Sequence, residues 1–207
     1  MSDPSQHRRS RFLIPDNAPL SLLGMIGPEA LDWLFLPGAE VWVTDMVRDE
    51  ALRDPDPDRD SRRRHRAAIR SWMEANRHRI RIQPTTEGEK YRNAMTLWEL
   101  AGKPPDHKPT WRDRGERSIL EVLGAARRAV QDGEAVIVIT DDADARAALK
   151  VIKDLDIDLM GTESFIDLVA EDYGAVDATT AWQAIVMAAD GKVPVIEDDP
   201  VTIRKGP

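Results

Sequence analysis

Acidic residues lie at the ends of the strands that the sequence predicts. Asp16 directly follows an apolar run at Arg11–Pro15, and Asp142 follows a second apolar run two residues after Thr140. The ligand-binding edge of an open α/β sheet is formed by the carboxyl ends of its parallel strands. Four separate segments can therefore bring carboxylates toward one edge of the sheet. The candidates are Asp16, Glu50, Glu116, Asp141, Asp142 and Asp144.

Carboxylates held close together repel one another, and each raises the pKa of its neighbours. A divalent cation relieves this repulsion. Because no His or Cys lies near these acids in the sequence, the oxygen ligands favour Mg²⁺ or Mn²⁺ over zinc. Magnesium held by a few carboxylates together with a substrate phosphate is the usual arrangement in sites of phosphoryl transfer.

Each acid taken alone also has a purely structural explanation. Asp16 and either Asp141 or Asp142 can cap the helix that follows, since a helix N-terminus favours a negative charge. Glu50 and Glu116 alone are most simply solvated helix residues. Only the combination, at matching places in the topology, favours a metal site.

The elements that must position these acids alternate along the chain. Strands are expected at Arg11–Pro15, Glu40–Thr44, Ile80–Gln83, Ala135–Thr140 and Ile157–Met160. Helices are expected between them, for example over Pro28–Leu36, Ser61–Asn76, Glu87–Ala101 and Asp142–Lys153, with Thr162 capping a helix near the C-terminus. In the second of these helices Ala67 is expected to face the core. This alternation predicts an α/β fold with a parallel sheet of about five strands and helices on both faces.

Composition limits the classes of function. The 207 residues are 42% hydrophobic, contain no cysteine, and include no apolar run of the roughly 18–20 residues that span a bilayer. No signal peptide is recognisable, so the cytoplasm is the expected location. The net charge of −8 argues against a nucleic-acid coat but allows an enzyme with a local basic surface.

A basic cluster and several missing motifs complete this picture. Arginines gather at Arg62, Arg63, Arg64 and Arg66, either to hold a phosphate backbone or as a solvated helix face. No glycine-rich nucleotide loop and no Gly-x-Ser-x-Gly elbow occurs. The four histidines are expected at the surface, and Tyr91, Met95 and Trp98 are expected in the core rather than in a base-stacking platform.

The ordered motifs resemble those of the PIN-domain family, which includes VapC-type toxins of toxin–antitoxin pairs. FLIPDNAPLSLL is similar to its opening strand, VWVTDMVRDEAL to its second strand and helix, and RGERSILEVLGAA to its acid-bearing helix. VIVITDDADARAAL resembles its Thr-x-Asp strand end, and MGTESFIDLVAEDYGAV resembles a closing Gly-Thr turn and helix. One departure is that Asn17 and Ala18 follow the first acid, where the family usually has a small hydroxyl residue and then Asn.

The resemblance implies a domain over residues 11–176 with a long insertion around 53–113, preceded by a disordered lead-in at 1–10 and followed by a helix and tail at 177–207. It implies Mg²⁺ or Mn²⁺ held by Asp16, Glu116 and Asp142, with Asp144 as an auxiliary ligand. Glu50 would act through water or orient the nucleophile.

The activity implied is hydrolysis of RNA phosphodiester bonds, with an antitoxin as a partner if the protein is a toxin. A degenerate scaffold without chemistry is the alternative, and the Asn17-Ala18 departure gives it some weight. A homodimer through the apolar side chains of residues 20–35 is also open, although core packing is the favoured explanation of those residues.

Overall fold

The computed structural model describes residues 9–53, 63–110 and 112–188. The expectations for the lead-in before residue 9, the charged loop at 54–60, Arg62 and the tail after residue 188 therefore lie outside the described residues. The first strand begins at Arg9, two residues earlier than expected, because Arg9 pairs with Glu134 of a neighbouring strand.

Five parallel strands form one sheet in the order β3-β2-β1-β4-β5. They are β1 (Arg9–Pro15), β2 (Glu40–Thr44), β3 (Ile80–Gln83), β4 (Glu134–Ile139) and β5 (Ile157–Met160). The predicted α/β class and the five-stranded parallel sheet are therefore confirmed. After their polar first residues, the central strands β1 and β4 consist of buried apolar residues (Phe12–Pro15 and Ala135–Ile139), as expected where helices cover both faces.

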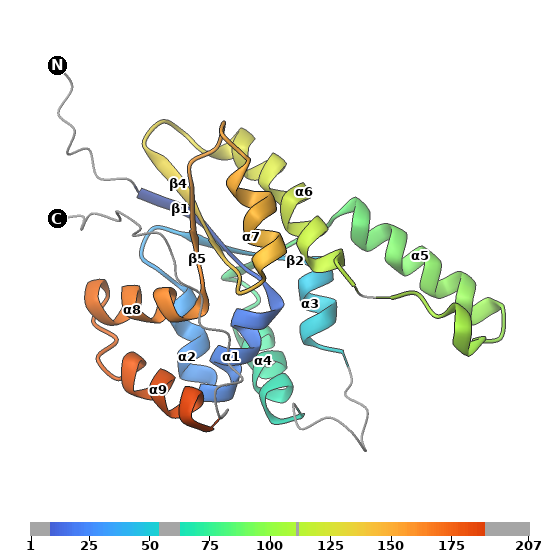
Figure 1. The fold of residues 1–207 in the computed structure, drawn as a ribbon, viewed down its shortest axis with the longest axis horizontal. Coiled ribbons are helices and arrows are strands. Elements are labelled where there is room, and N and C mark those ends of the chain that lie inside the picture. Colours follow the sequence, from blue (N-terminus) through green and yellow to red (C-terminus); the bar gives the residue numbers. More distant parts are fainter. Residues whose placement is uncertain (1–8, 54–62, 111, 189–207) are drawn as a thin grey trace.

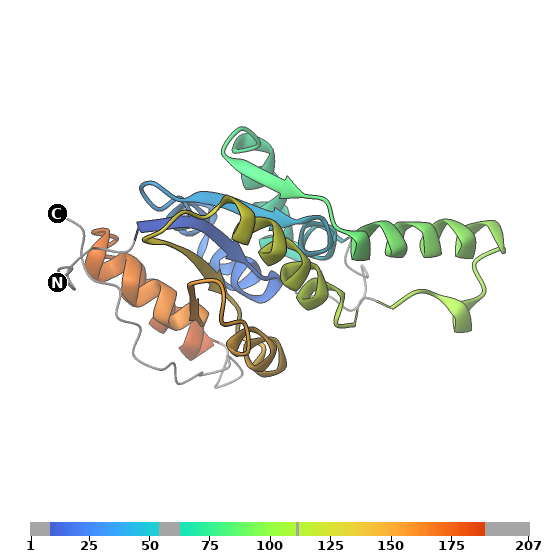
Figure 2. The same ribbon diagram turned by 90° about the horizontal axis from the view of Figure 1, so that it is seen from above.

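Helices connect the strands and flank the sheet (Figures 1 and 2). They are α1 (Asn17–Ile26), α2 (Pro28–Leu31), α3 (Asp45–Ala51), α4 (Arg63–Ala75), α5 (Thr86–Leu100), α6 (Arg114–Ala129), α7 (Ala143–Lys150), α8 (Thr162–Asp172) and α9 (Ala178–Ala188). Helix α1 packs against α2, α4 and α9, whereas α6 packs against α3 and α5.

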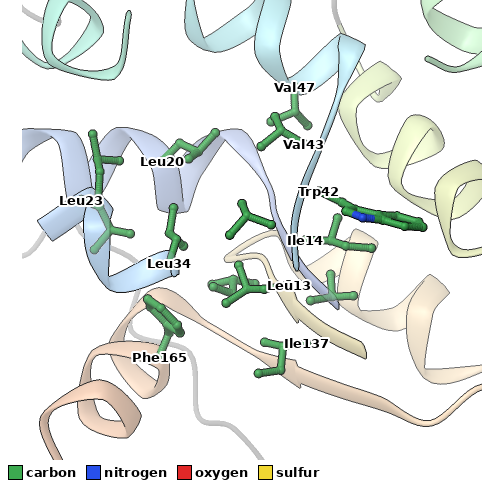
Figure 3. Close-up of a cluster of buried hydrophobic side chains, with 14 of the residues drawn as sticks. Leu13, Ile14, Leu20, Leu23, Leu34, Trp42, Val43, Val47, Ile137 and Phe165 are labelled. Carbon is green, nitrogen blue, oxygen red and sulfur yellow. The ribbon is translucent and has the colours of Figure 1, made fainter. Parts of the chain in front are cut away.

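The core fills the space on both sides of β1, because successive side chains of a strand point to opposite faces. Leu13 lies with Leu34 and Phe165, whereas Ile14 lies near Trp42 (Figure 3). All five of these side chains are buried. The apolar side chains of residues 20–35 differ in exposure: Leu23 and Leu34 lie in the core, whereas Met25 is exposed.

Several local predictions were wrong for identifiable reasons. Residues 28–36 form α2 followed by a 3-10 turn at Asp32–Leu34 instead of one helix. His65 is buried on α4 rather than at the surface, and Ala67 of the same helix is exposed rather than in the core. Periodicity locates a helix but leaves the rotation of its buried face uncertain by about one residue.

Part of the stretch expected as an insertion belongs to the sheet and its layers. Helix α4 packs against α1, and β3 is a strand of the sheet. Helix α5 and the segment after it instead extend away from the sheet (Figures 1 and 2). Of the three aromatic and apolar residues expected in the core on α5, only Tyr91 is buried, whereas Met95 and Trp98 are partly exposed. No helix in the described ranges is long and apolar enough to cross a bilayer.

Candidate active site

Asp16 lies at the carboxyl end of the central strand β1. Its backbone N–H donates to the carbonyl of Ile139 on β4 (2.9 Å), which extends the pairing of the two strands by one residue. Its side chain caps α1, because Oδ1 accepts from the N–H of Asn17 (2.7 Å). Oδ2 accepts from the hydroxyl of Thr140 (3.0 Å). Both carboxylate oxygens are therefore held in place by strand-end residues.

Burial raises the pKa of Asp16 above its usual value, against the lowering effect of its hydrogen bonds from Asn17 and Thr140. The negative charges of Asp142 and Asp141 raise the pKa further. Asp16 therefore caps a helix and also presents a desolvated carboxylate to other acids.

Glu50 comes from α3 and lies beside the same strand end. Its Oε2 atom and Asp16 Oδ1 are each 3.5 Å from the position that a Cβ atom would occupy on Gly115. The two oxygens are therefore separated by at most twice that distance. Burial raises the pKa of Glu50, and the charge of Asp16 raises it further, whereas Arg53, a hydrogen bond from the Asn17 side chain and Arg66 lower it.

Glu116 lies in the first turn of α6, directly after Gly115. The pKa of Glu116 is raised first by desolvation and then by the negative charges of four aspartates. Those aspartates are Asp142, Asp113, Asp144 and Asp16. Acids from β1, α6 and the start of α7 are therefore within electrostatic range of one another.

Asp142 and Asp141 have separate structural tasks at the end of β4. Asp142 caps α7, with Oδ1 accepting from the N–H groups of Asp144 (2.9 Å) and Ala145 (2.8 Å). The carboxylate of Asp141 accepts from the N–H (2.7 Å) and the hydroxyl (2.6 Å) of Thr162 on α8. The prediction that Thr162 caps its own helix was therefore wrong, because Gly161 is the N-cap and Asp141 supplies the acceptor.

These side chains border one pocket of about 420 Å³ at the carboxyl edge of the sheet. Its lining consists of Asp16, Asn17, Ala18, Glu50, Arg112, Asp113, Gly115, Glu116, Asp141 and Asp142. The structure thus brings together Asp16, Glu50, Glu116 and Asp142. Asp144 is exposed and outside this lining, although its charge acts on Glu116.

The basic residues expected to hold nucleic acid are only partly placed. Arg62 lies outside the described residues, and Arg63 and Arg64 are described by their backbone in α4 alone. Arg66 donates to the carbonyl of Arg53 (2.6 Å), and both arginines lower the pKa of Glu50. Positive charge therefore lies near the Glu50 side of the pocket.

The sequence reasoning missed Arg112 as a residue of the pocket. Arg112 is exposed and makes a weak ion pair with Asp113 (3.7 Å). Asp113 has a left-handed backbone (φ 60°) and precedes the helix that carries Glu116. The signal was the position of Arg112 four residues before Glu116, in the turn that leads into the helix carrying that acid.

The donor set suits a hard divalent cation in chemical type. Carboxylates dominate, and Asn17 Oδ1 is a buried oxygen without a hydrogen-bond partner at the pocket wall. Within the described ranges, however, no three Asp, Glu or His side chains are close enough together to hold one metal ion. The carboxylates of Asp142 and Asp141 are each engaged in hydrogen bonds to a helix N-terminus.

A further strand-end acid lies outside the pocket. Asp45 follows β2 and is buried, and its carboxylate accepts from Thr85 (2.6 Å) and pairs with Arg92 of α5 (2.8 Å). This aspartate fixes the base of α5. An acid at the end of a parallel strand is thus not by itself evidence for a catalytic role.

The fold and the pocket define an α/β protein with an acidic cavity at the carboxyl edge of a parallel sheet. Neither a family model nor a curated protein matches this chain.

Proposed function

We propose that the protein is a Mg²⁺- or Mn²⁺-dependent ribonuclease with a PIN-like fold. The observation that carries the proposal is the placement of Asp16 and Glu50 around Gly115, with Glu116 as the next residue of α6. Three acids from segments far apart in the sequence thus border one pocket, and burial raises the pKa of each. Carboxylates whose pKa values are raised together in one pocket are typical of functional sites.

Asp16, Glu116 and Asp142 are the residues that would hold the ion, with Asp144 at the outer edge. Because no three acids of the described residues form a preformed ligand group, their side chains would have to move closer together to hold it. When bound, the ion supplies Lewis-acid stabilisation of the phosphate charge. Glu50 is the candidate to accept a proton from the attacking water, and Asn17 orients Glu50 through its side-chain hydrogen bond. Arg112 is exposed at the pocket and is suited to contact a phosphate of the substrate.

The test is cleavage of RNA by the purified protein with Mg²⁺ or Mn²⁺, with EDTA and with Asp16→Asn and Asp142→Asn variants. Asp132→Asn is the matched control, because Asp132 is an exposed aspartate in the turn before β4, outside the pocket lining. We expect cleavage that requires the ion, Asp16 and Asp142 but not Asp132. Metal-independent cleavage, or full activity of Asp16→Asn, would exclude the proposed site.

The degenerate scaffold is the second candidate, favoured by the absence of a preformed three-ligand group among the described residues. Calorimetric titration with Mn²⁺ separates the two candidates, because only the enzyme requires the ion. If the protein is a toxin, an antitoxin is its partner, and a cytoplasmic location suits a chain without cysteine. Co-purification from the native host would recover that partner, whereas a protein that is always recovered alone would speak against the toxin role.

A further inference from the structure

Helix α5 and the segment 101–110 form an arm that extends from the sheet (Figures 1 and 2). Two ion pairs fix its base: Arg92 with Asp45 (2.8 Å) and Arg114 with Glu87 (2.7 Å). Asp45 is buried, and both members of the second pair are mostly buried. Because Arg114 is the first residue of α6, these contacts set the arm's direction relative to the helix that carries Glu116.

An aromatic side chain with two neighbouring cations lies on the outer part of the arm. The indole N–H of Trp98 donates to the carbonyl of Pro104 (2.7 Å), which fixes the ring against the returning chain. The ammonium groups of Lys108 and Lys103 lie 5.4 Å and 5.9 Å from the ring centre. Both lysines are exposed, and the ion pair of Lys103 with Glu99 (3.4 Å) is exposed and therefore weak.

The arm also leads back to the acidic pocket. The chain that follows Lys108 returns to Arg112, an exposed cation that lines the pocket. From Thr86 to Trp98 the helix rises about 18 Å, at roughly 1.5 Å per residue. Lys103 and Lys108 thus provide positive charge outside the pocket, and Arg112 provides it at the pocket itself, whose own carboxylates repel phosphate.

We propose that Trp98, Lys103 and Lys108 bind a single-stranded segment of the RNA whose scissile phosphate lies at the pocket. This inference rests on the proposed nuclease function. Unpaired bases stack on an aromatic ring irrespective of sequence, and lysines contact the phosphates between them. A regular duplex hides its base faces, so the surface selects single-stranded RNA.

Charge complementarity favours RNA over a protein as the occupant. The chain carries a net charge of −8, yet residues 103–108 contain two lysines against one aspartate. The arm also exposes Leu97 (67%) and Leu100 (79%), which a protein partner would cover. RNA binding through Trp98 and the lysines should therefore not depend on these leucines.

The test is binding of a fluorescein-labelled single-stranded oligouridine by anisotropy, in EDTA to prevent cleavage, over a series of salt concentrations. The variants are Lys103→Gln with Lys108→Gln, and Trp98→Leu. Arg128→Gln with Lys153→Gln removes the same charge from exposed residues outside the arm and the pocket. Leu97→Ser with Leu100→Ser changes only the apolar face of the arm.

We expect the lysine pair to lower the magnitude of the log–log salt slope by about 1.4, since each phosphate contact on a single strand contributes roughly 0.7. Trp98→Leu should weaken binding on the order of tenfold through lost stacking. The Arg128/Lys153 and Leu97/Leu100 variants should bind as the wild type does. Equal binding by the wild type and both arm variants would overturn the proposal, as would weaker RNA binding by the leucine variant alone, which would place the RNA contact on the apolar face of the arm instead of on Trp98 and the lysines.

The outcome separates this inference from the proposed function. Weaker binding by the arm variants, in a protein that never cleaves RNA with Mn²⁺, would retain the docking surface and reject the nuclease. Metal-dependent cleavage together with unchanged binding by the arm variants would retain the nuclease and reject the docking surface.

Discussion

The hydroxyl of Thr140 donates a hydrogen bond to Asp16 Oδ2 at 3.0 Å, across 124 residues of sequence. The same hydroxyl oxygen accepts from the N–H of Asp142 (3.3 Å). The side chain of Thr140, which is fully buried, therefore connects the ends of the two central strands. The Thr-x-Asp motif thus has a physical meaning here: Thr140 orients Asp16 and joins it to the turn that carries Asp142.

Replacing Thr140 should therefore impair the site more than the fold. Thr140→Val keeps the shape but removes both the donor to Asp16 and the acceptor for the N–H of Asp142, at a cost of about 1–3 kcal/mol in unfolding free energy. We expect RNA cleavage at limiting Mn²⁺ to fall by about tenfold or more, because a supporting contact to a ligand typically contributes 10–100-fold. Urea unfolding and cleavage rates measure the two effects.

Thr140→Ser is the matched control, since it retains the hydroxyl and should keep most of the activity. If valine and serine behave alike, the hydroxyl does not orient Asp16 in the working enzyme.

The sheet could be predicted from sequence because its two central strands contain short apolar runs that end at a polar residue, and the other strands are short segments containing β-branched or aromatic residues between helical patterns. Three strands have the predicted bounds: Glu40–Thr44, Ile80–Gln83 and Ile157–Met160. The edge that carries the site followed from the same pattern, since residues that end parallel strands share one edge. The gathering of Asp16, Glu50 and Glu116 was predictable to that extent.

What the sequence left open depends on contacts between distant residues. Asp45 and Asp142 both follow strands, but Asp45 pairs with Arg92 while Asp142 lines the pocket. Nothing local to either residue distinguishes them, because the partner comes from another helix. The capping of α8 by Asp141 could not be predicted for the same reason, because the acceptor comes from another segment of the chain.

The pH dependence of stability should reveal the half-buried Glu50 of α3. The pKa of Glu50 is raised above 4.5 by burial first and by Asp16 second. A raised pKa means that the folded protein binds the proton more tightly than the unfolded chain, so Glu50 lowers stability progressively as pH rises through and above 4.5. In EDTA, Glu50→Gln should therefore gain unfolding free energy relative to the wild type between pH 4 and pH 7.

Urea denaturation at each pH measures this difference, and Glu29→Gln, an exposed glutamate outside the pocket, is the control. A constant difference between wild type and Glu50→Gln across this range would show that Glu50 is well solvated in solution.

Divalent ions should stabilise the folded protein independently of any substrate. An ion that binds only the folded state adds about 2.7 kcal/mol to the unfolding free energy at a concentration of 100 times Kd. We expect Mn²⁺ to raise the melting temperature of the wild type in a concentration-dependent manner. Asp16→Asn should lose this increase, whereas Asp132→Asn should retain it. The same rise in both variants would place the ion elsewhere on the protein.

Two glycines in neighbouring helices should respond to alanine in opposite directions. A Cβ atom on Gly88 would overlap the carboxylate of Asp45, which is buried and tied to Arg92. Gly124 lies on an exposed part of α6 with open space at the Cβ position. Gly124→Ala should therefore add about 0.5–1 kcal/mol to the unfolding free energy through helix propensity. Gly88→Ala should lower it by about 1–3 kcal/mol, in the range of overpacked sites.

Urea unfolding of both variants tests the pair. Stabilisation by both substitutions would show that α5 is not held against Asp45, and the direction of the arm would then not be fixed by this contact.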